Sequence, residues 1–242
     1  MSSSIIRAAP IVVPATAKHT ATVIFAHGLG DTGNGWTVTV QSWRKQGRLD
    51  GVKFILPHAP TIPITCNWGT RMPGWFDIHT IDGNVESLRR NEDEKGILES
   101  QAYFQELIQT EVDSGVQVVL GGFSQGGAMS ILSGLTAKVK LAGIVALSSW
   151  LPLSVKFAEL VPKPEINKET PIFMGHGDAD RVVPTALGTL SYDLLKGLGY
   201  NATLKIYPGM PHMTFTEELE DVEAFLVESL RAAEDNEGKS EL

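Results

Sequence analysis

The feature that most constrains this chain is a glycine-flanked serine directly after an apolar run. The sequence G-x-S-x-G spans residues 122–126 with Ser124 at its centre, and the β-branched stretch Val116 to Leu120 precedes it. A helix-compatible run from Ser124 to Thr136 follows. A strand that turns sharply into a helix at this pattern exposes the serine hydroxyl, and the glycines avoid clashes with neighbouring elements. The context therefore favours a nucleophilic serine over an incidental serine in a Gly-rich turn.

Short apolar runs bounded by Gly and Pro recur along the chain, and most of them lack polar alternation. Strands look like this when helices cover both faces of a parallel sheet. We expect strands at Thr22 to Ala26, Val52 to Leu56, Val116 to Leu120, Leu141 to Leu147, Ile172 to Met174 and Ala202 to Tyr207. Helical patterns between them predict βαβ units, and so an α/β fold with a mostly parallel central sheet flanked by helices.

The helical patterns and the remaining segments suggest a single domain over residues 1–231. Asn91 and Glu94 resemble a capping box before one helix. Further helices are expected at Ser124 to Thr136, Pro184 to Leu198 and Phe215 to Leu230. The polar stretch 232–242 is expected to be a frayed C-terminal tail. The segment from Pro57 to Asn84 reads as a long loop, whose aromatic side chains either line a pocket or join the core.

Composition limits the partners and the compartment of the protein. The 242-residue chain carries a net charge of −8 and scattered basic residues, which argues against a nucleic-acid partner. Its single cysteine, Cys66, excludes an intramolecular disulfide and suits the cytoplasm. Arg7, Pro10 and Pro14 interrupt the apolar N-terminal residues, so a signal peptide is not expected. No apolar run approaches the roughly 18–20 residues of a membrane span.

A nucleophilic serine needs a base and an acid that orients the base. In α/β sheets with this serine turn, the partners follow in the order Ser, acid, His. His212 is the only histidine after Asp180, and both residues come directly after predicted strands. We prefer Asp180 as the acid, although the loop position alone cannot separate it from Asp178. Asp178 is also explained as a turn residue whose carboxylate bonds nearby backbone N–H groups.

A metal-assisted hydrolase is the alternative for the acidic loop. His176, Asp178 and Asp180 could serve as ligands, but no second His/Asp cluster completes such a site, so no metal is expected.

Hydrolysis also requires donors for a developing oxyanion. One expected donor is the backbone N–H of Gln125, the residue after the serine. The other is the backbone N–H of Leu29, in the Gly-rich loop after the strand that ends at Ala26. His27 is expected to hold this loop rather than to act as a second base.

Seven motifs in order resemble those of the acyl-protein thioesterases, which belong to the phospholipase/carboxylesterase group of the α/β-hydrolase fold. They are H-G-L-G-D-T-G at 27–33, P-H-A-P at 57–60, W-F-D-I at 75–78, G-G-F-S-Q-G-G at 121–127, S-W-L-P at 149–152, H-G-D-A-D at 176–180 and G-M-P-H at 209–212. The resemblance extends from about Thr22 to Leu230.

The resemblance implies a cytosolic enzyme without a cofactor that hydrolyses palmitoyl thioesters on S-acylated proteins, and also lysophospholipids and small esters. Peripheral contact with membranes and a weak homodimer are compatible with it. It implies the triad Ser124, Asp180 and His212, with Leu29 and Gln125 as oxyanion donors, and so selects the second aspartate as the acid. The residues that it implies along an acyl channel are Trp75, Phe76, Ile78, Trp150 and Val182.

The chain also departs from the pattern of these thioesterases. Ser2-Ser3-Ser4 offers no N-terminal cysteine, so self-acylation is not expected. His79 stands where an aliphatic residue is common, which predicts a different chain-length preference, and Pro211 stiffens the loop of the base. A general esterase for short acyl groups is the alternative function. A non-enzymatic binding module is disfavoured, because such a protein has no reason to keep all three residues of the triad.

Overall fold

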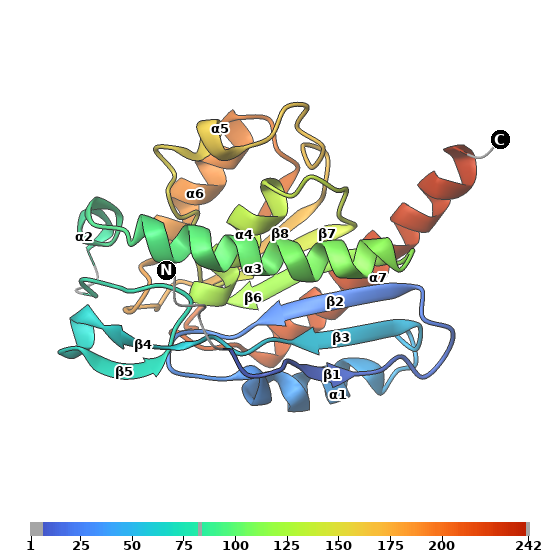
Figure 1. Ribbon diagram of the computed structural model, residues 1–242, viewed down its shortest axis with the longest axis horizontal. Coiled ribbons are helices and arrows are strands. Elements are labelled where there is room, and N and C mark those ends of the chain that lie inside the picture. Colours follow the sequence, from blue (N-terminus) through green and yellow to red (C-terminus); the bar gives the residue numbers. More distant parts are fainter. Residues whose placement is uncertain (1–6, 82–83, 241–242) are drawn as a thin grey trace, which may run out of the picture.

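The computed structural model describes residues 7–81 and 84–240, so the expectation for Ser2-Ser3-Ser4 lies outside the described residues. Figure 1 shows one central sheet with helices on both of its faces. Its strand order is β1-β3-β2-β6-β7-β8-β9, and every neighbouring pair is parallel except β1 with β3. The strands are β1 (Ile11–Val13), β2 (Ala21–Ala26), β3 (Val52–Leu56), β6 (Gln117–Phe123), β7 (Gly143–Leu147), β8 (Ile172–Gly177) and β9 (Ala202–Tyr207).

The apolar runs of the sequence form the centre of this sheet. Every residue of β2 and of β7 is buried, as expected for strands covered on both faces. The predicted α/β fold with a mostly parallel sheet is confirmed. Ile11, Val12 and Val13 form the short edge strand β1 between Pro10 and Pro14. A proline cannot donate to a sheet ladder, and an edge strand tolerates it next to its ends.

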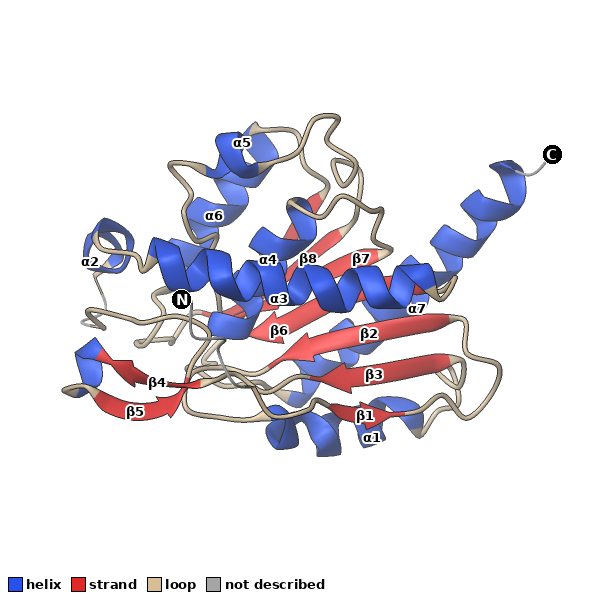
Figure 2. Cartoon of the chain, in the orientation of Figure 1, coloured by secondary structure: helices blue, strands red, loops and turns tan. Residues whose placement is uncertain are grey.

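Helices cover the two faces of the sheet unequally (Figure 2). One face carries α3 (Glu94–Asp113), α4 (Gln125–Leu135) and α6 (Thr185–Gly197), and its core includes Phe104 and Ile131. The other carries α1 (Thr37–Arg44) and α7 (Thr216–Ser240), with Trp43 and Leu226 in its core. Shorter helices are η1 (Gly33–Trp36), η2 (Thr65–Asn67), α2 (Val85–Arg90) and α5 (Phe157–Leu160). None of the helices in the described ranges combines the length and apolarity needed to cross a bilayer.

The expected long loop between Pro57 and Asn84 contains a β-hairpin. Strands β4 (Thr61–Ile64) and β5 (Thr70–Pro73) pair antiparallel. Pro63 and Pro73 lie within these strands, and each strand of a two-stranded ribbon has a free edge that needs no N–H. In Figure 1 the hairpin lies beyond the arrowheads of β2 and β3, so it borders the carboxyl edge of the main sheet.

Two helix ends differ from the predictions. Asn91 does not cap α3; the cap is Asp93, whose Oδ1 accepts a hydrogen bond from the Gly96 N–H at 3.0 Å. The capping box failed because Asn91 instead follows the last turn of α2. At the C-terminus, α7 continues past Leu230 to Ser240, although residues 232–242 were expected to fray. The hydrophobic pattern ends near Leu230, but Ala232 and Ala233 favour helix, and Ala233 still packs against the core.

Candidate active site

Ser124 occupies the sharp turn between β6 and α4. Its φ of 56° and ψ of −122° lie in a region that side chains rarely adopt, and its N–H donates to the Leu147 carbonyl at 2.8 Å. Backbone strain of this kind persists only where surrounding structure enforces it. Here the parallel pairing of β6 with β7 supplies that structure, so the serine hydroxyl is held at the carboxyl edge of the sheet.

The flanking glycines are required by close packing around this turn. A Cβ on Gly122 would lie 2.4 Å from the carbonyl carbon of Gly126. A Cβ on Gly126 would lie 2.2 Å from the Ala26 carbonyl oxygen, which belongs to the neighbouring strand β2. Any side chain at either position would therefore move α4 away from the sheet and disturb the direction of Ser124.

The loops after three strands bring the predicted catalytic side chains together. His212 follows β9, and its Nε2 lies 3.0 Å from the Oγ of Ser124. Asp180 follows β8, and its Oδ2 lies 2.7 Å from the Nδ1 of His212. With the Nδ1–H donated to the carboxylate, Nε2 is left with a lone pair facing the serine. This arrangement can remove the hydroxyl proton and stabilise the imidazolium that results.

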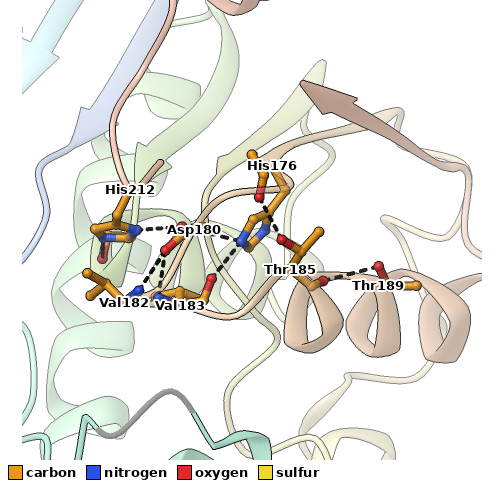
Figure 3. A network of polar contacts seen from close by, with 9 residues as sticks. His176, Asp180, Val182, Val183, Thr185, Thr189 and His212 are labelled. Atoms are coloured by element: carbon orange, nitrogen blue, oxygen red, sulfur yellow. Dashed lines mark hydrogen bonds and ion pairs between the residues drawn. The ribbon is translucent and has the colours of Figure 1, made fainter. Parts of the chain in front are cut away.

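Asp180 is fixed by contacts with both carboxylate oxygens (Figure 3). Oδ1 accepts hydrogen bonds from the backbone N–H groups of Val182 and Val183, both at 2.9 Å. Oδ2 also lies 3.4 Å from the Nε2 of buried His176, which in turn contacts the Val183 carbonyl at 2.9 Å. Burial alone would raise the pKa of Asp180, but the hydrogen bonds from His176 and His212 outweigh it and hold the pKa well below its usual range.

The competing aspartate has a different position. Asp178 is exposed, and its Oδ1 accepts a hydrogen bond from the Gly209 N–H at 2.6 Å. This bond ties the loop after β8 to the loop after β9. Asp178 therefore positions the segment that carries His212, while only Asp180 contacts the imidazole. His176 and Asp178 direct their polar atoms to the protein itself, and no group of three or more metal-binding side chains occurs among the described residues.

The Gly-rich loop after β2 approaches the serine closely. A Cβ on Gly28 would lie 3.2 Å from the Cβ of Ser124, a tight contact that the glycine avoids. His27 is fully buried; its Nδ1 donates to the Gly28 carbonyl at 2.7 Å, and its Nε2 accepts from the Ala59 N–H at 3.0 Å. Burial lowers the pKa of His27, and the bond to Gly28 offsets this in part. His27 thus holds the loop as a neutral side chain, in line with the expectation from sequence.

The candidate oxyanion donors lie on the two segments that adjoin Ser124. Gln125 begins α4, and the first N–H groups of a helix have no partner within it. Leu29 follows Gly28 in the close-approaching loop, which is tied to the hairpin by a 2.8 Å bond from the Gly30 N–H to the Pro73 carbonyl. Both N–H groups therefore belong to rigidly held backbone next to the nucleophile.

An apolar cavity of about 150 Å³ opens beside the serine. Its lining includes three of the five residues expected along an acyl channel, namely Ile78, Trp150 and Val182. The other lining residues are Gly28, Leu29, Ile81, Leu88, Phe123, Ser124 and Val183. Apart from the serine hydroxyl and the indole N–H of Trp150, the lining side chains are apolar, so the cavity suits a hydrocarbon chain attached to the reacting carbonyl.

Trp75 and Phe76, which were also expected along the channel, are not among the residues that line this cavity. The Trp75 indole N–H donates to the His27 carbonyl at 2.8 Å, and the indole packs on Phe104 in the core. Phe76 is 3% exposed and packs edge-on against Trp150, so it supports the cavity wall from behind. The aromatic residues of W-F-D-I thus belong to the core, and Ile78 alone reaches the cavity.

Comparison with known proteins agrees with this architecture. The sequence pattern of the family described as Phospholipase/Carboxylesterase matches residues 7–230. The chain belongs to the phospholipase/carboxylesterase family. It is 65% identical to acyl-protein thioesterase 1 of Neurospora crassa, over 99% of this chain and 100% of that protein. It is 59% identical to the protein of that name from Gibberella zeae, over 93% and 97% of the two chains.

Solved structures show the same relationship. The crystal structure of Zea mays acyl-protein thioesterase 2 superposes with a TM-score of 0.81 at 29% identity, covering 91% of this chain and 98% of that one. Arabidopsis thaliana SOBER1 gives a TM-score of 0.80 at 31% identity, over 87% and 99%. As a member of the phospholipase/carboxylesterase family, the protein is a hydrolytic enzyme.

Sequence reasoning did not find several residues that shape the site of this family member. Ile81 and Leu88 line the cavity, but they lie in no motif, and only the path of the chain before and through α2 brings them there. The Gln125 side chain also has a structural part. Its Oε1 accepts from the Trp75 N–H at 3.0 Å, and its Nε2 donates to the Phe76 carbonyl at 2.8 Å. The position of Gln125 directly after the serine predicted the role of its backbone N–H, but it did not predict these side-chain hydrogen bonds.

Proposed function

We propose that the protein is an acyl-protein thioesterase that cleaves long-chain acyl groups from cysteines of S-acylated proteins, and related esters and lysophospholipids. The observation that carries this proposal is the apolar cavity that opens directly beside Ser124 and within reach of the Ser124–His212–Asp180 chain of hydrogen bonds. The cavity would hold the acyl chain while the serine attacks the thioester carbonyl.

The reaction then proceeds in two halves through an acyl-enzyme. The Oγ of Ser124 attacks the carbonyl carbon as His212 takes its proton, and the N–H groups of Leu29 and Gln125 stabilise the oxyanion. The intermediate collapses when the C–S bond breaks, and the imidazolium protonates the departing thiolate. Water, activated by the same histidine, then attacks the ester on Ser124 and releases the fatty acid. The side chains and backbone of the protein supply every group in this sequence, so we propose no cofactor.

The test of this proposal is the dependence of kcat/KM on acyl-chain length from C2 to C16, measured below micelle-forming concentrations. Each methylene buried in an apolar channel contributes about 0.8 kcal/mol, so four further carbons raise kcat/KM by about two orders of magnitude if all are desolvated. We expect kcat/KM to rise beyond C4 and to level off where the chain reaches water. A maximum at C4 or below would favour the general short-chain esterase and contradict the lipid-thioesterase function.

The role of Ser124 is tested separately with Ser124→Ala. Activity on every ester in the series should fall to background, since no acyl-enzyme can form. Activity within tenfold of the parent enzyme, in a preparation free of other esterases, would remove Ser124 from its role.

We further propose peripheral contact with a membrane through the tip of the β4–β5 hairpin. Trp68 at this tip is 98% exposed, and the base of the hairpin contacts the Gly-rich loop through Gly30. Tryptophan is favoured at membrane interfaces, because its ring is apolar while its N–H stays hydrated. Contact here would present the site to a lipid-anchored substrate.

Sedimentation with anionic vesicles tests the hairpin. Trp68→Ala should reduce vesicle binding severalfold, while Val38→Ala on α1, which removes another exposed apolar side chain, should not. Equal binding of both variants would contradict the contact. A cytoplasmic location and a weak homodimer remain part of the proposal and can be measured by cell fractionation and analytical ultracentrifugation.

A further inference from the structure

A second cavity, of about 260 Å³, lies next to His212 and is distinct from the apolar one. Its lining residues are Asp31, Gly35, Trp36, Thr39, Phe123, His212, Met213 and Thr214. The Phe123 side chain lines both cavities, and its ring centroid lies 4.9 Å from that of the His212 imidazole. Phe123 therefore divides the space around the reacting atoms into a side bordered by Ser124 and a side bordered by His212.

The chemistry of the acyl transfer gives these two sides different occupants. When the C–S bond breaks, the departing sulfur must receive its proton from His212, so the leaving group has to lie next to the imidazole. The acyl chain remains attached to Ser124 and needs an apolar environment, which the cavity bordered by the serine provides. The space beside His212 is thus left for the peptide that carries the cysteine.

The second cavity differs from the first in its polarity. The only charged or titratable side chains in its lining are Asp31 and His212. Thr39 and Thr214 add hydroxyl groups, while Met213 is 51% exposed and offers apolar surface at the rim. A lysine or arginine side chain matches this combination, because its hydrocarbon stem packs on apolar surface while its charged end seeks a carboxylate.

The Asp31 carboxylate is held in place and lacks a cationic partner in the described part of the chain. Its Oδ1 accepts a hydrogen bond from the Thr32 N–H at 2.7 Å. A Cβ on Gly35 would lie 2.2 Å from its Oδ2, so the glycine lets the carboxylate rest against η1. An exposed and uncompensated negative charge at a fixed position favours a cation from outside the molecule.

We propose that this second cavity binds the peptide flanking the acylated cysteine and that Asp31 selects a Lys or Arg next to that cysteine. The inference rests on the thioesterase function proposed above and adds the sequence context of its protein substrates. A peptide with an acidic residue next to the cysteine is disfavoured, since that side chain would face the Asp31 carboxylate.

The experiment compares three synthetic peptides of equal length, each with one S-octanoyl cysteine flanked by Lys, Ser or Glu. The octanoyl group keeps the substrates below micelle formation. We measure kcat/KM for the parent enzyme, for Asp31→Asn and for the control Asp193→Asn, which removes one exposed negative charge from α6. Asparagine at position 31 retains an oxygen for the Thr32 N–H. The readout is the ratio of the Lys to the Glu peptide within each variant, so a partly unfolded preparation does not change it.

The parent enzyme and Asp193→Asn should prefer the Lys peptide over the Glu peptide by about tenfold at low salt, as expected for one attractive and one repulsive pair of partly exposed charges. Asp31→Asn should reduce this ratio to about twofold or less, and raising the salt concentration should reduce it in the parent enzyme. Equal rates on the three peptides, or a ratio that Asp31→Asn leaves intact, would overturn the inference.

A parallel assay with an octanoyl thioester of a small neutral thiol separates the two proposals. If the enzyme cleaves this thioester but shows no preference among the charged peptides, the proposed role of Asp31 is wrong and the thioesterase function stands. If neither the small thioester nor any peptide is cleaved, the proposed function itself fails, and the inference fails with it.

Discussion

The carboxylate of Asp180 has a fixed direction as well as a charge. Both of its oxygens accept hydrogen bonds, from the backbone of Val182 and Val183 on one side and from His212 on the other. The imidazole is thereby oriented toward Ser124. Asp178, only two positions earlier, instead holds the Gly209 N–H. The two aspartates of this loop thus have different roles, because they contact different groups.

The first prediction contrasts these two acids. Asp180→Asn should lower kcat by about four orders of magnitude, because an amide favours the wrong imidazole tautomer at His212. Asp178→Asn should lower kcat less than about tenfold and should mainly reduce the free energy of unfolding, by about 1 kcal/mol for one weakened hydrogen bond. Steady-state kinetics and urea denaturation of both variants check this. The opposite ranking of kcat would exchange the two roles.

Single residues also show what sequence could and could not predict. Ser124, Asp180 and His212 could be predicted because parallel strands end at one edge, and each residue lies within a few positions of the end of a predicted strand. Trp75 lies in an equally clear motif, yet its indole turns into the core to donate to the His27 carbonyl. Side-chain direction in an irregular segment depends on contacts with distant parts of the chain, which no spacing rule records.

At the scale of elements, α2 and the segment after Trp150 are joined by polar contacts near the acyl cavity. Both carboxylate oxygens of Glu92 lie 3.0 Å from the Leu153 N–H. A guanidinium nitrogen of Arg89 donates to the Ser154 Oγ at 3.0 Å. Burial raises the pKa of Glu92, and the Leu153 N–H offsets this in part. These contacts hold two walls of the cavity together.

The second prediction follows from this connection. Glu92→Ala should loosen the wall that carries Trp150 and lower the ratio of kcat/KM for C12 over C4 substrates by about fivefold, the equivalent of one lost hydrogen bond. Glu94→Ala is the control, because it removes an exposed ion pair with Lys156 from the same segment. An unchanged chain-length ratio in Glu92→Ala would show that the cavity keeps its shape without this contact.

Elements also differ in how far the sequence reveals them. The six short apolar runs became β2, β3, β6, β7, β8 and β9. Most residues are buried in every one of these strands except the edge strand β9, and burial on both faces imposes a strong pattern. The hairpin β4–β5 was missed, since its two short strands are half-exposed and contain prolines. Short elements of this kind are defined by pairing with each other, and local composition does not predict them.

At the scale of the whole molecule, one buried acid links stability to pH. Glu218 in the first turn of α7 is fully buried, and its carboxyl oxygens have no hydrogen-bond partner among the described residues. Burial, together with the negative charge of Asp221, raises its pKa to about 8. Asp221 itself is engaged by Lys205 and by the Tyr207 hydroxyl. Glu218 is therefore protonated in the folded protein at neutral pH.

The third prediction concerns the free energy of unfolding. In the unfolded chain Glu218 releases its proton above pH 4.5, while in the folded protein it keeps the proton up to about pH 8. The folded state binds more protons in this window, so Glu218 makes stability fall as the pH rises from about 4.5 to about 8, and its effect levels off above that.

Glu218→Gln should remove this part of the slope, since glutamine has no proton to release. Urea denaturation at several pH values between 5 and 9 measures it, with Glu220→Gln on the exposed side of α7 as the control. A slope in Glu218→Gln equal to that of the parent protein would contradict the assignment.

Neighbouring strands of the central sheet lie far apart in the sequence, and this has a consequence for the folding of the protein during synthesis. β2 pairs directly with β6, joining Ala21 to Gln117, and Ser124 meets a histidine 88 positions later. A growing chain on the ribosome therefore exposes the apolar edge of β2 until β6 has emerged, and it cannot acquire activity before β9 is complete. Non-local strand pairing of this kind forms slowly and leaves partly folded intermediates that are prone to aggregate. Activity should thus return later than helical circular dichroism during refolding, and chaperones that shield strand edges should raise the yield of active enzyme.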